Sequence, residues 1–167
     1  MSVTAVATAA GAQAVSIRDG VVPDDIELCV EIWVRAVEAR DGRVDAEGMA
    51  ERVRMAFENP VVRFAIATSP RQGFSLLESG RPEPSEALLH FFAVHPDGAA
   101  RGVGAALLAD AIAHAKLGGF RSLVLEVRTN NTRAIELYTR AGFVAFGSHV
   151  PHPLAGWPMQ PYRLALD

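Results

Sequence analysis

The sequence predicts a single mixed α/β domain in which strands alternate with amphipathic helices. Its 167 residues suffice for one domain with a sizeable core. Half of the residues are hydrophobic and 21% are charged, as is usual for a globular protein. Apolar periods of two residues and of about 3.6 residues succeed one another along the chain. These periods predict the order strand, two helices, three strands, helix, strand, helix and two strands.

The N-terminal third is predicted to hold a short strand and two helices. A strand is expected at 15–18, and Pro23-Asp24-Asp25 is a typical helix opening. A second, more polar helix is expected from about Asp45 to Phe57, before Asn59-Pro60. The apolar residues of the first helix fall on one helical face; they are Ile26, Val30, Trp33, Val34 and Val37.

Three consecutive strands are predicted at 61–68, 73–79 and 87–94. The last of them, ALLHFFAV, is a continuous apolar run, as expected of a strand covered on both faces. A helix over 102–117 and a strand over 122–128 follow it. Strand, helix and strand in this order predict a parallel crossover.

The C-terminal part is predicted to be a helix followed by two strands. Asn130-Asn131-Thr132 opens a helix that reaches about Ala141 and is closed by Gly142. Strands are expected at 143–150 and 162–166. The proline-rich segment that joins them is long for a hairpin and is a candidate for lining a pocket.

Composition excludes several classes of protein. The net charge of −3 and the lack of a basic block argue against nucleic-acid binding. The single cysteine, Cys29, permits no disulfide scaffold within one chain and is expected to be a buried apolar residue. No cluster has the spacing of metal ligands. Residues 1–14 lack the features of a signal peptide and are predicted to be a disordered tail, which leaves a domain over 15–167. With no apolar run long enough for a membrane span, we expect a cytoplasmic protein without a membrane partner.

The stretch AVHPDGAARGVGAALL, residues 93–108, points to an anion site. It leaves a strand through small residues and opens a helix at once. Exposed backbone N–H groups and a helix N-terminus together favour a phosphate. A P-loop is excluded, because no lysine and hydroxyl residue stand at the required positions. The Rossmann fingerprint lacks its third small residue, since Leu107 stands there, and four strands precede the loop.

A second informative stretch is LEVRTNNTRAIELYTRAGF at 125–143, and the two stretches together contain two sequence motifs. Ala99-Ala100-Arg101-Gly102-Val103-Gly104 matches [QR]-x-x-G-x-[GA] except at its first position. The pattern N-x-x-A-x-x-x-Y…G-F is complete as Asn131, Ala134, Tyr138, Gly142 and Phe143. With both motifs in order, the sequence resembles the Gcn5-related N-acetyltransferases (GNAT), most closely in motif the ribosomal-protein N-terminal acetyltransferases.

The resemblance implies a fold and a co-substrate. The fold is a mixed, mostly antiparallel sheet of six to seven strands flanked by four helices, with a parallel pair at the cofactor site. The co-substrate is acetyl-CoA, and no metal is implied. The residues expected to bind it are Phe92, Ala93, Val94, Ala99, Ala100, Arg101, Gly102, Val103, Gly104, Asn131 and Tyr138. Ala99 removes one side-chain contact, whereas the backbone N–H groups of the loop remain and Arg101 adds positive charge.

The resemblance also implies two catalytic residues. Tyr138 matches the family's tyrosine that protonates the leaving thiolate, and a phenol is a suitable donor to a thiolate. Glu126 matches the glutamate that takes the proton of the amine. A structural alternative pairs Glu126 with Arg128 or another arginine, and a histidine or water could serve as base. Of the five histidines, His149 and His152 are expected as substrate-side contacts rather than bases.

We therefore expect direct acetyl transfer from acetyl-CoA to a primary amine, either a peptide N-terminus or a small molecule. The acidic net charge favours a cationic acceptor. Two alternatives stay open, namely a CoA-binding module without turnover and an unrelated nucleotide-binding α/β domain. Homodimers are common in the family the sequence resembles, so a homodimer is a further possibility.

Overall fold

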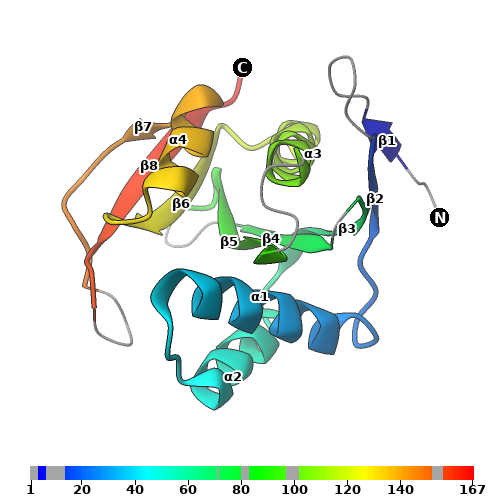
Figure 1. Cartoon of the computed structure of the whole chain (residues 1–167). Coiled ribbons are helices and arrows are strands. Elements are labelled where there is room, and N and C mark those ends of the chain that lie inside the picture. Colours follow the sequence, from blue (N-terminus) through cyan, green and yellow to red (C-terminus); the bar gives the residue numbers. More distant parts are fainter. Residues whose placement is uncertain (1–3, 7–13, 71, 80–82, 97–101, 152–155) are drawn as a thin grey trace.

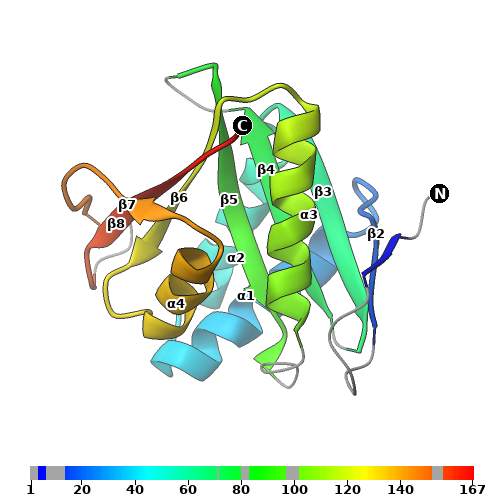
Figure 2. The ribbon, with the colours of Figure 1, turned by 90° about the horizontal axis from the view of Figure 1, so that it is seen from above.

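One twisted sheet of eight strands runs through the molecule, with helices on both faces (Figures 1 and 2). The computed structural model describes residues 4–6, 14–70, 72–79, 83–96, 102–151 and 156–167. The strands are β1 (Thr4–Val6), β2 (Val15–Asp19), β3 (Val61–Ser69), β4 (Gly73–Ser79), β5 (Glu86–Val94), β6 (Ser122–Arg128), β7 (Val144–Ala145) and β8 (Met159–Ala165). The helices are α1 (Ile26–Asp41), α2 (Ala46–Ala56), α3 (Val103–Leu117) and α4 (Thr132–Arg140).

The sheet has the order β1-β2-β3-β4-β5-β6-β8-β7. Neighbouring strands are antiparallel except β5 and β6, which are parallel and are connected through α3. Helices α1 and α2 cover one face, and α3 and α4 cover the other (Figure 1). The predicted mixed, mostly antiparallel sheet with four helices and one parallel crossover is confirmed.

The strands at the two edges of the sheet differ from the prediction. Thr4–Val6, within the expected disordered tail, pairs with β2 as an eighth strand. The predicted strand over 143–150 is reduced to β7 and a single bridge from Val150 to Met159. β8 begins three residues earlier than expected and contains Pro161. Pairing at sheet edges depends on backbone partners more than on side-chain pattern, so the sequence signal there is weak.

Apolar side chains fill the space on both faces of the sheet. Beneath α1 and α2 the core contains Cys29, Ile32 and Phe74, all fully buried. Beneath α3 and α4 it contains Leu108, Leu125 and Tyr138, among others. Helix α1 buries Cys29, Ile32 and Val37, of which only Val37 belongs to the apolar face predicted for it. Val30 and Trp33 of that face are partly buried against the core.

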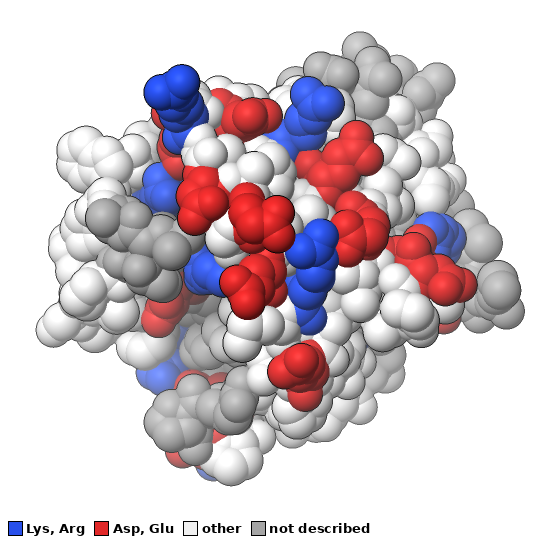
Figure 3. All heavy atoms as spheres, turned by 90° about the horizontal axis from the view of Figure 1, so that it is seen from below, with Lys and Arg blue, Asp and Glu red and all other residues white. Residues whose placement is uncertain are grey.

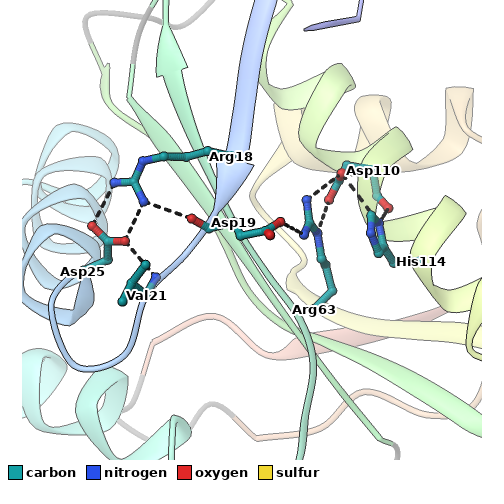
Figure 4. Close-up of polar contacts among 7 residues, drawn as sticks. All are labelled: Arg18, Asp19, Val21, Asp25, Arg63, Asp110 and His114. Atoms are coloured by element: carbon teal, nitrogen blue, oxygen red, sulfur yellow. Dashed lines mark hydrogen bonds and ion pairs between the residues drawn. The ribbon is translucent and has the colours of Figure 1, made fainter. Parts of the chain in front are cut away.

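Polar contacts tie the first strands to the helices (Figure 4). Arg63 on β3 donates from Nε and Nη2 to both carboxylate oxygens of Asp110 on α3, at 2.9 and 3.1 Å. Its Nη1 also reaches Asp19 at the end of β2. Arg18 holds Asp25, the residue before α1, by two hydrogen bonds of 2.6 and 2.8 Å. These contacts fix α1 and α3 on opposite faces of β2 and β3.

The parallel pair β5–β6 separates soon after it forms. Its register joins only Glu86–Leu88 to Ser122–Val124. On its other side β5 stays paired with β4 as far as Val94. From residue 89 onward, β5 therefore has a backbone edge toward β6 that is not used by the sheet. This divergence positions the site described next.

Candidate active site

A cavity of about 820 Å³ lies where β5 and β6 diverge. A volume of this size fits a sizeable small molecule. Four elements besides the two strands contribute to its wall: α1 supplies Trp33, α3 supplies Gly104, α4 supplies Tyr138 and β8 supplies Met159. The cavity therefore joins the layer of α1 to the layer of α3 and α4 through the gap in the sheet.

The N-terminus of α3 forms one end of the cavity. Gly102 precedes the helix with φ of 77°, a left-handed conformation that glycine adopts without strain. The first N–H that bonds within the helix is that of Ala106, which donates to the Gly102 carbonyl at 3.0 Å. The preceding N–H groups have no acceptor among the described residues and so can bind an anion, as is usual for the first turn of a helix. Of the predicted loop, Gly102, Val103 and Gly104 line the cavity, whereas Ala99, Ala100 and Arg101 lie outside the described residues.

Gly104 leaves space that a larger residue would occupy. A Cβ atom built there would lie 3.4 Å from Leu137 and 3.8–3.9 Å from Val94 and Phe92. All of these residues line the cavity. A bulky side chain at this position would therefore fill the cavity beside β5.

Tyr138 lies in the wall formed by α4, with only 6% of its surface exposed. Its ring contacts Phe92 and Phe143 edge-on or tilted, at centroid distances of 6.0 and 5.8 Å. Burial raises the pKa of Tyr138 well above its ordinary value. The phenol is thus protonated at neutral pH and is available as a hydrogen-bond donor.

Part of the second motif serves α4 itself. The Asn131 side chain accepts a hydrogen bond from the Ala134 N–H at 3.3 Å and so caps the helix, while Asn131 also lines the cavity. Gly142, with φ of 99°, ends the helix in the left-handed region. The Phe143 N–H then donates to the Tyr138 carbonyl at 3.0 Å. The motif therefore sets where α4 starts, where it ends and how Tyr138 faces the cavity.

Glu126 lines the cavity from β6 and is exposed. Its neighbours Leu125 and Val127 are buried on the other side of the strand, as the alternation predicted. The alternative pairing with Arg128 is wrong, because Arg128 Nη1 donates to Asp41 at 2.6 Å, which ties β6 to the end of α1. Within the described part of the chain, Glu126 forms no ion pair.

The cavity also includes residues that the motifs did not identify. Trp33 and Arg40 reach it from α1, and His90 reaches it from β5. His90 is the extra residue of a β-bulge, since Leu76 pairs with Phe91 and Leu77 with Leu89. The apolar pattern of ALLHFFAV does not reveal the bulge, and the polar residue His90 within this run was the only available signal.

Cys29, His114 and His149 do not line the cavity. Cys29 is fully buried and is absent from the cavity wall, and burial raises its pKa to about 12. A thiol in this state is inert as a nucleophile. His114 lies on α3, where its Nδ1 donates to the Asp110 carbonyl at 2.9 Å. His149 does not contribute to the cavity, and His152 lies outside the described residues.

The described residues include neither a helix that could span a membrane nor a group of metal ligands. No helix among them has the length and apolar character needed to cross a bilayer. No group of three or more His, Cys, Asp or Glu side chains in the same residues is arranged to hold a metal ion.

Solved structures of the same fold include proteins from several bacteria. A GNAT-family protein from Desulfovibrio desulfuricans is 26% identical, with a TM-score of 0.71 over 92% of this chain and 100% of that chain. YncA from Salmonella typhimurium, solved with its cofactor acetyl-CoA, is 20% identical, with a TM-score of 0.69 over 92% and 94%. The ribosomal-protein-S18-alanine N-acetyltransferase from Escherichia coli is 23% identical, with a TM-score of 0.70 over 92% and 94%. No curated protein sequence matches the chain.

The family comparison covers the region that builds the cavity. The model of the acetyltransferase (GNAT) family matches residues 39–143, from the last turn of α1 to three residues beyond α4. This range is well over half of the chain. It includes the divergent strands, the glycine-rich helix start and the motif of α4. The chain therefore belongs to the acetyltransferase (GNAT) family.

Proposed function

We propose that this protein transfers an acetyl group from acetyl-CoA to a primary amine. The observation that carries the proposal is the cavity between β5 and β6, which has an anion site at one end and Tyr138 in its wall. The free N–H groups at the start of α3 suit the pyrophosphate of CoA. The unused edge of β5 at Phe92–Val94 offers backbone groups to the amide-containing pantetheine arm, much as an added strand would.

The transfer is direct, within a complex of both substrates. The amine nitrogen attacks the thioester carbonyl, the C–S bond breaks, and the sulfur takes a proton. Tyr138 supplies that proton, since its buried phenol is protonated at neutral pH. The proton of the amine goes to a base in the same cavity. Glu126 is the carboxylate that serves the amine, either by taking this proton or by holding the ammonium ion.

The outer face of α1 and α2 favours a cationic acceptor through long-range attraction, although four arginines and two glutamates line the cavity itself. Acidic side chains gather over α1 and α2, with arginines between them (Figure 3). The exposed acidic residues of the two helices include Glu27, Glu31, Glu38, Glu47 and Glu51. Such a surface raises the local concentration of cations. A peptide N-terminus, as in the ribosomal-protein acetyltransferase of the same fold, and a polyamine are the acceptors to try first.

A binding experiment tests the co-substrate. Acetyl-CoA, CoA, NAD and ATP are titrated against the wild type while the melting temperature is followed. Gly104→Trp should raise the Kd for acetyl-CoA by about tenfold or more, equivalent to about 1.4 kcal/mol or more. Leu117→Trp is the matched control, because Leu117 is exposed on the same helix and away from the cavity. Stabilisation by NAD or ATP alone would contradict the proposal and favour an unrelated nucleotide-binding domain.

A turnover experiment separates an enzyme from a CoA-binding module. Thiol release from acetyl-CoA is measured with two probe amines, an alanine-initiated hexapeptide and spermidine. Tyr138→Phe should lower kcat by about a hundredfold while leaving the Kd for acetyl-CoA near its wild-type value. Tight binding without thiol release for a broad set of amines would instead favour the non-catalytic module.

A further inference from the structure

A buried carboxylate lies behind the cavity at its β5 wall. Glu78, on β4, is 1% exposed, yet it is an ionisable residue on the same strand as the fully buried Phe74, Leu76 and Leu77. Among the described residues, Asn59 and His90 reach it. Asn59 Nδ2 donates to its two oxygens at 3.3 and 3.2 Å, and His90 Nδ1 forms a hydrogen bond with Oε1. A carboxylate buried to this extent needs such partners.

His90 connects this carboxylate to the cavity. Its side chain is 32% exposed and contributes to the cavity wall, beside the tilted ring of Phe91 at 4.6 Å. The β-bulge places His90 between Leu89, which packs toward α3 and α4, and Phe91, which packs toward α1. The imidazole therefore has one nitrogen facing a buried acid and belongs to the wall of the proposed reaction site.

The hydrogen bond to Glu78 decides which ring nitrogen carries the proton. When Glu78 is ionised its carboxylate can only accept, and Nδ1 then bears the hydrogen. In the neutral imidazole Nε2 then has a free lone pair. No hydrogen bond to Nε2 is found in the part of the chain that the structure describes. A neutral imidazole oriented in this way is a proton acceptor.

We propose that His90 accepts the proton of the acceptor amine through Nε2, and that buried Glu78 positions it. This inference rests on the proposed acetyl transfer and names the base for it. As the amine nitrogen bonds to the acetyl carbon, its proton passes to Nε2, and Glu78 stabilises the imidazolium that forms. Glu126 then serves as the carboxylate that holds the cationic acceptor before attack.

An imidazole suits this role better than a carboxylate does. The His90 ring is held in place by its hydrogen bond to Glu78, whereas Glu126 is exposed and forms no ion pair among the described residues. Several other charged or titratable groups face the same cavity. They are Arg40 from α1, Glu126 and Arg128 from β6, and Arg133, Glu136, Tyr138 and Arg140 from α4.

The first test reads the tautomer without any turnover. Long-range ¹H–¹⁵N correlation spectra of the full chain, with His90 assigned by its loss in His90→Gln, should show Nδ1 protonated and Nε2 bare. His114 provides an internal reference, because its Nδ1 donates to a backbone carbonyl. In Glu78→Gln the carboxylate that holds the Nδ1 hydrogen is lost, so the fraction of His90 protonated on Nε2 should rise. Glu86→Gln, a carboxylate on β5 that instead pairs with Arg163, should leave it unchanged.

The second test is kinetic and uses acetyl-CoA with the two probe amines. His90→Gln should lower kcat by about a hundredfold and should abolish the rise of kcat/KM with pH on its acidic limb. Glu78→Gln should lower kcat while the Kd for acetyl-CoA stays at its wild-type value. His114→Gln and Glu86→Gln are the matched controls and should behave as the wild type.

The outcomes separate this inference from the function on which it rests. A wild type that binds acetyl-CoA but acetylates no amine overturns the proposed function, and the spectra then still decide whether Glu78 sets the tautomer. A wild type that acetylates an amine, together with full activity and an unchanged pH profile in His90→Gln, overturns the role of His90. An Nε2-protonated His90 in the wild type also overturns it.

Discussion

Ser75 on β4 has the one buried side-chain polar atom without a hydrogen-bond partner among the described residues. It lies between Phe74 and Leu76, and all three are fully buried. A buried hydroxyl that has lost its water contacts destabilises the folded state unless a partner replaces them. The apolar packing of the core must therefore offset the destabilisation caused by the Ser75 hydroxyl.

Ser75→Ala should increase the free energy of unfolding by about 1 kcal/mol, because it removes the unsatisfied hydroxyl and little volume. Urea unfolding at neutral pH measures this. Ser122→Ala is the control, since the Ser122 hydroxyl donates to Glu86 at 3.2 Å and its loss should lower stability. A drop in stability for Ser75→Ala would mean that its hydroxyl has a partner in solution.

Asp25 gives the stability a dependence on pH. Arg18, which donates two hydrogen bonds to it, lowers the pKa of Asp25, and the Val21 N–H acts in the same direction at 2.8 Å (Figure 4). A carboxyl group whose pKa is lower in the folded state stabilises the protein at pH values above its unfolded pKa. This stabilisation is lost as the pH falls through the folded pKa.

Asp25→Asn should therefore lower the free energy of unfolding by about 2 kcal/mol at pH 7. The difference from the wild type should be complete above about pH 5 and should shrink below about pH 4. Urea unfolding at a series of pH values measures it, with exposed Asp24→Asn as control. A difference that stays constant down to pH 3 would contradict the pairing with Arg18.

At the level of elements, the start of α3 uses two glycines for different reasons. Gly102 has a positive φ, whereas Gly104 lies within the helix and faces the cavity. The first is required by the backbone conformation, and the second by the space that a ligand would use. The two requirements predict opposite effects on stability.

Gly102→Ala should lower the free energy of unfolding by about 1–2 kcal/mol, because an L-residue is strained in the left-handed region. Gly104→Ala should raise it by up to about 1 kcal/mol, because alanine is the better helix former. The same Gly104→Ala substitution should weaken acetyl-CoA binding, since its Cβ lies near Leu137 and Val94. Calorimetric titration and urea unfolding of both variants test the pair. Unchanged affinity in Gly104→Ala would remove this helix turn from the proposed cofactor site.

Elements inside the sheet could be predicted closely from the sequence, and its edges could not. The strand at 122–128 and the helix that follows Gly102 lie where their apolar periods place them. The strand of Pro161 was expected to begin after the proline, because proline lacks the N–H that a strand interior uses. The bulge at His90 was missed because an apolar run looks the same with or without an extra residue.

In the candidate site, local features could be predicted from the sequence and contacts between distant segments could not. Residues of the two motifs could be found from local spacing, since Gly102 and Asn131 each act within their own turn of chain. The pairing of His90 with Glu78 joins two strands and depends on a register that only the folded sheet defines. The tie between Arg128 and Asp41 spans 87 residues and likewise has no local signal.

Considered as a whole, the molecule consists of two parts that share a short junction. Strands β1–β5 with α1–α3 form one part, and β6–β8 with α4 form the other (Figure 2). In the sheet, the junction is three residue pairs between β5 and β6. A ligand in the cavity would contact both parts and reinforce this junction.

Acetyl-CoA should therefore slow amide hydrogen exchange in residues 89–94 and in the first turn of α3. Peptide-level exchange by mass spectrometry measures this, with and without acetyl-CoA. Peptides from β3 provide the control, because this strand is paired on both sides by β2 and β4. Equal exchange in 89–94 with and without acetyl-CoA would contradict the use of this edge.

The divergence of β5 and β6 has a consequence for how the protein behaves among other chains. An unpaired strand edge is ordinarily a place where another chain adds and aggregation begins. Here the edge is recessed, with β6 and α4 beyond it and Trp33 of α1 in the same cavity wall. A neighbouring polypeptide strand would have to enter between these elements. A narrow, flexible ligand such as the pantetheine arm of CoA can pass between them. The same recess that admits a narrow ligand thus protects the sheet from self-association.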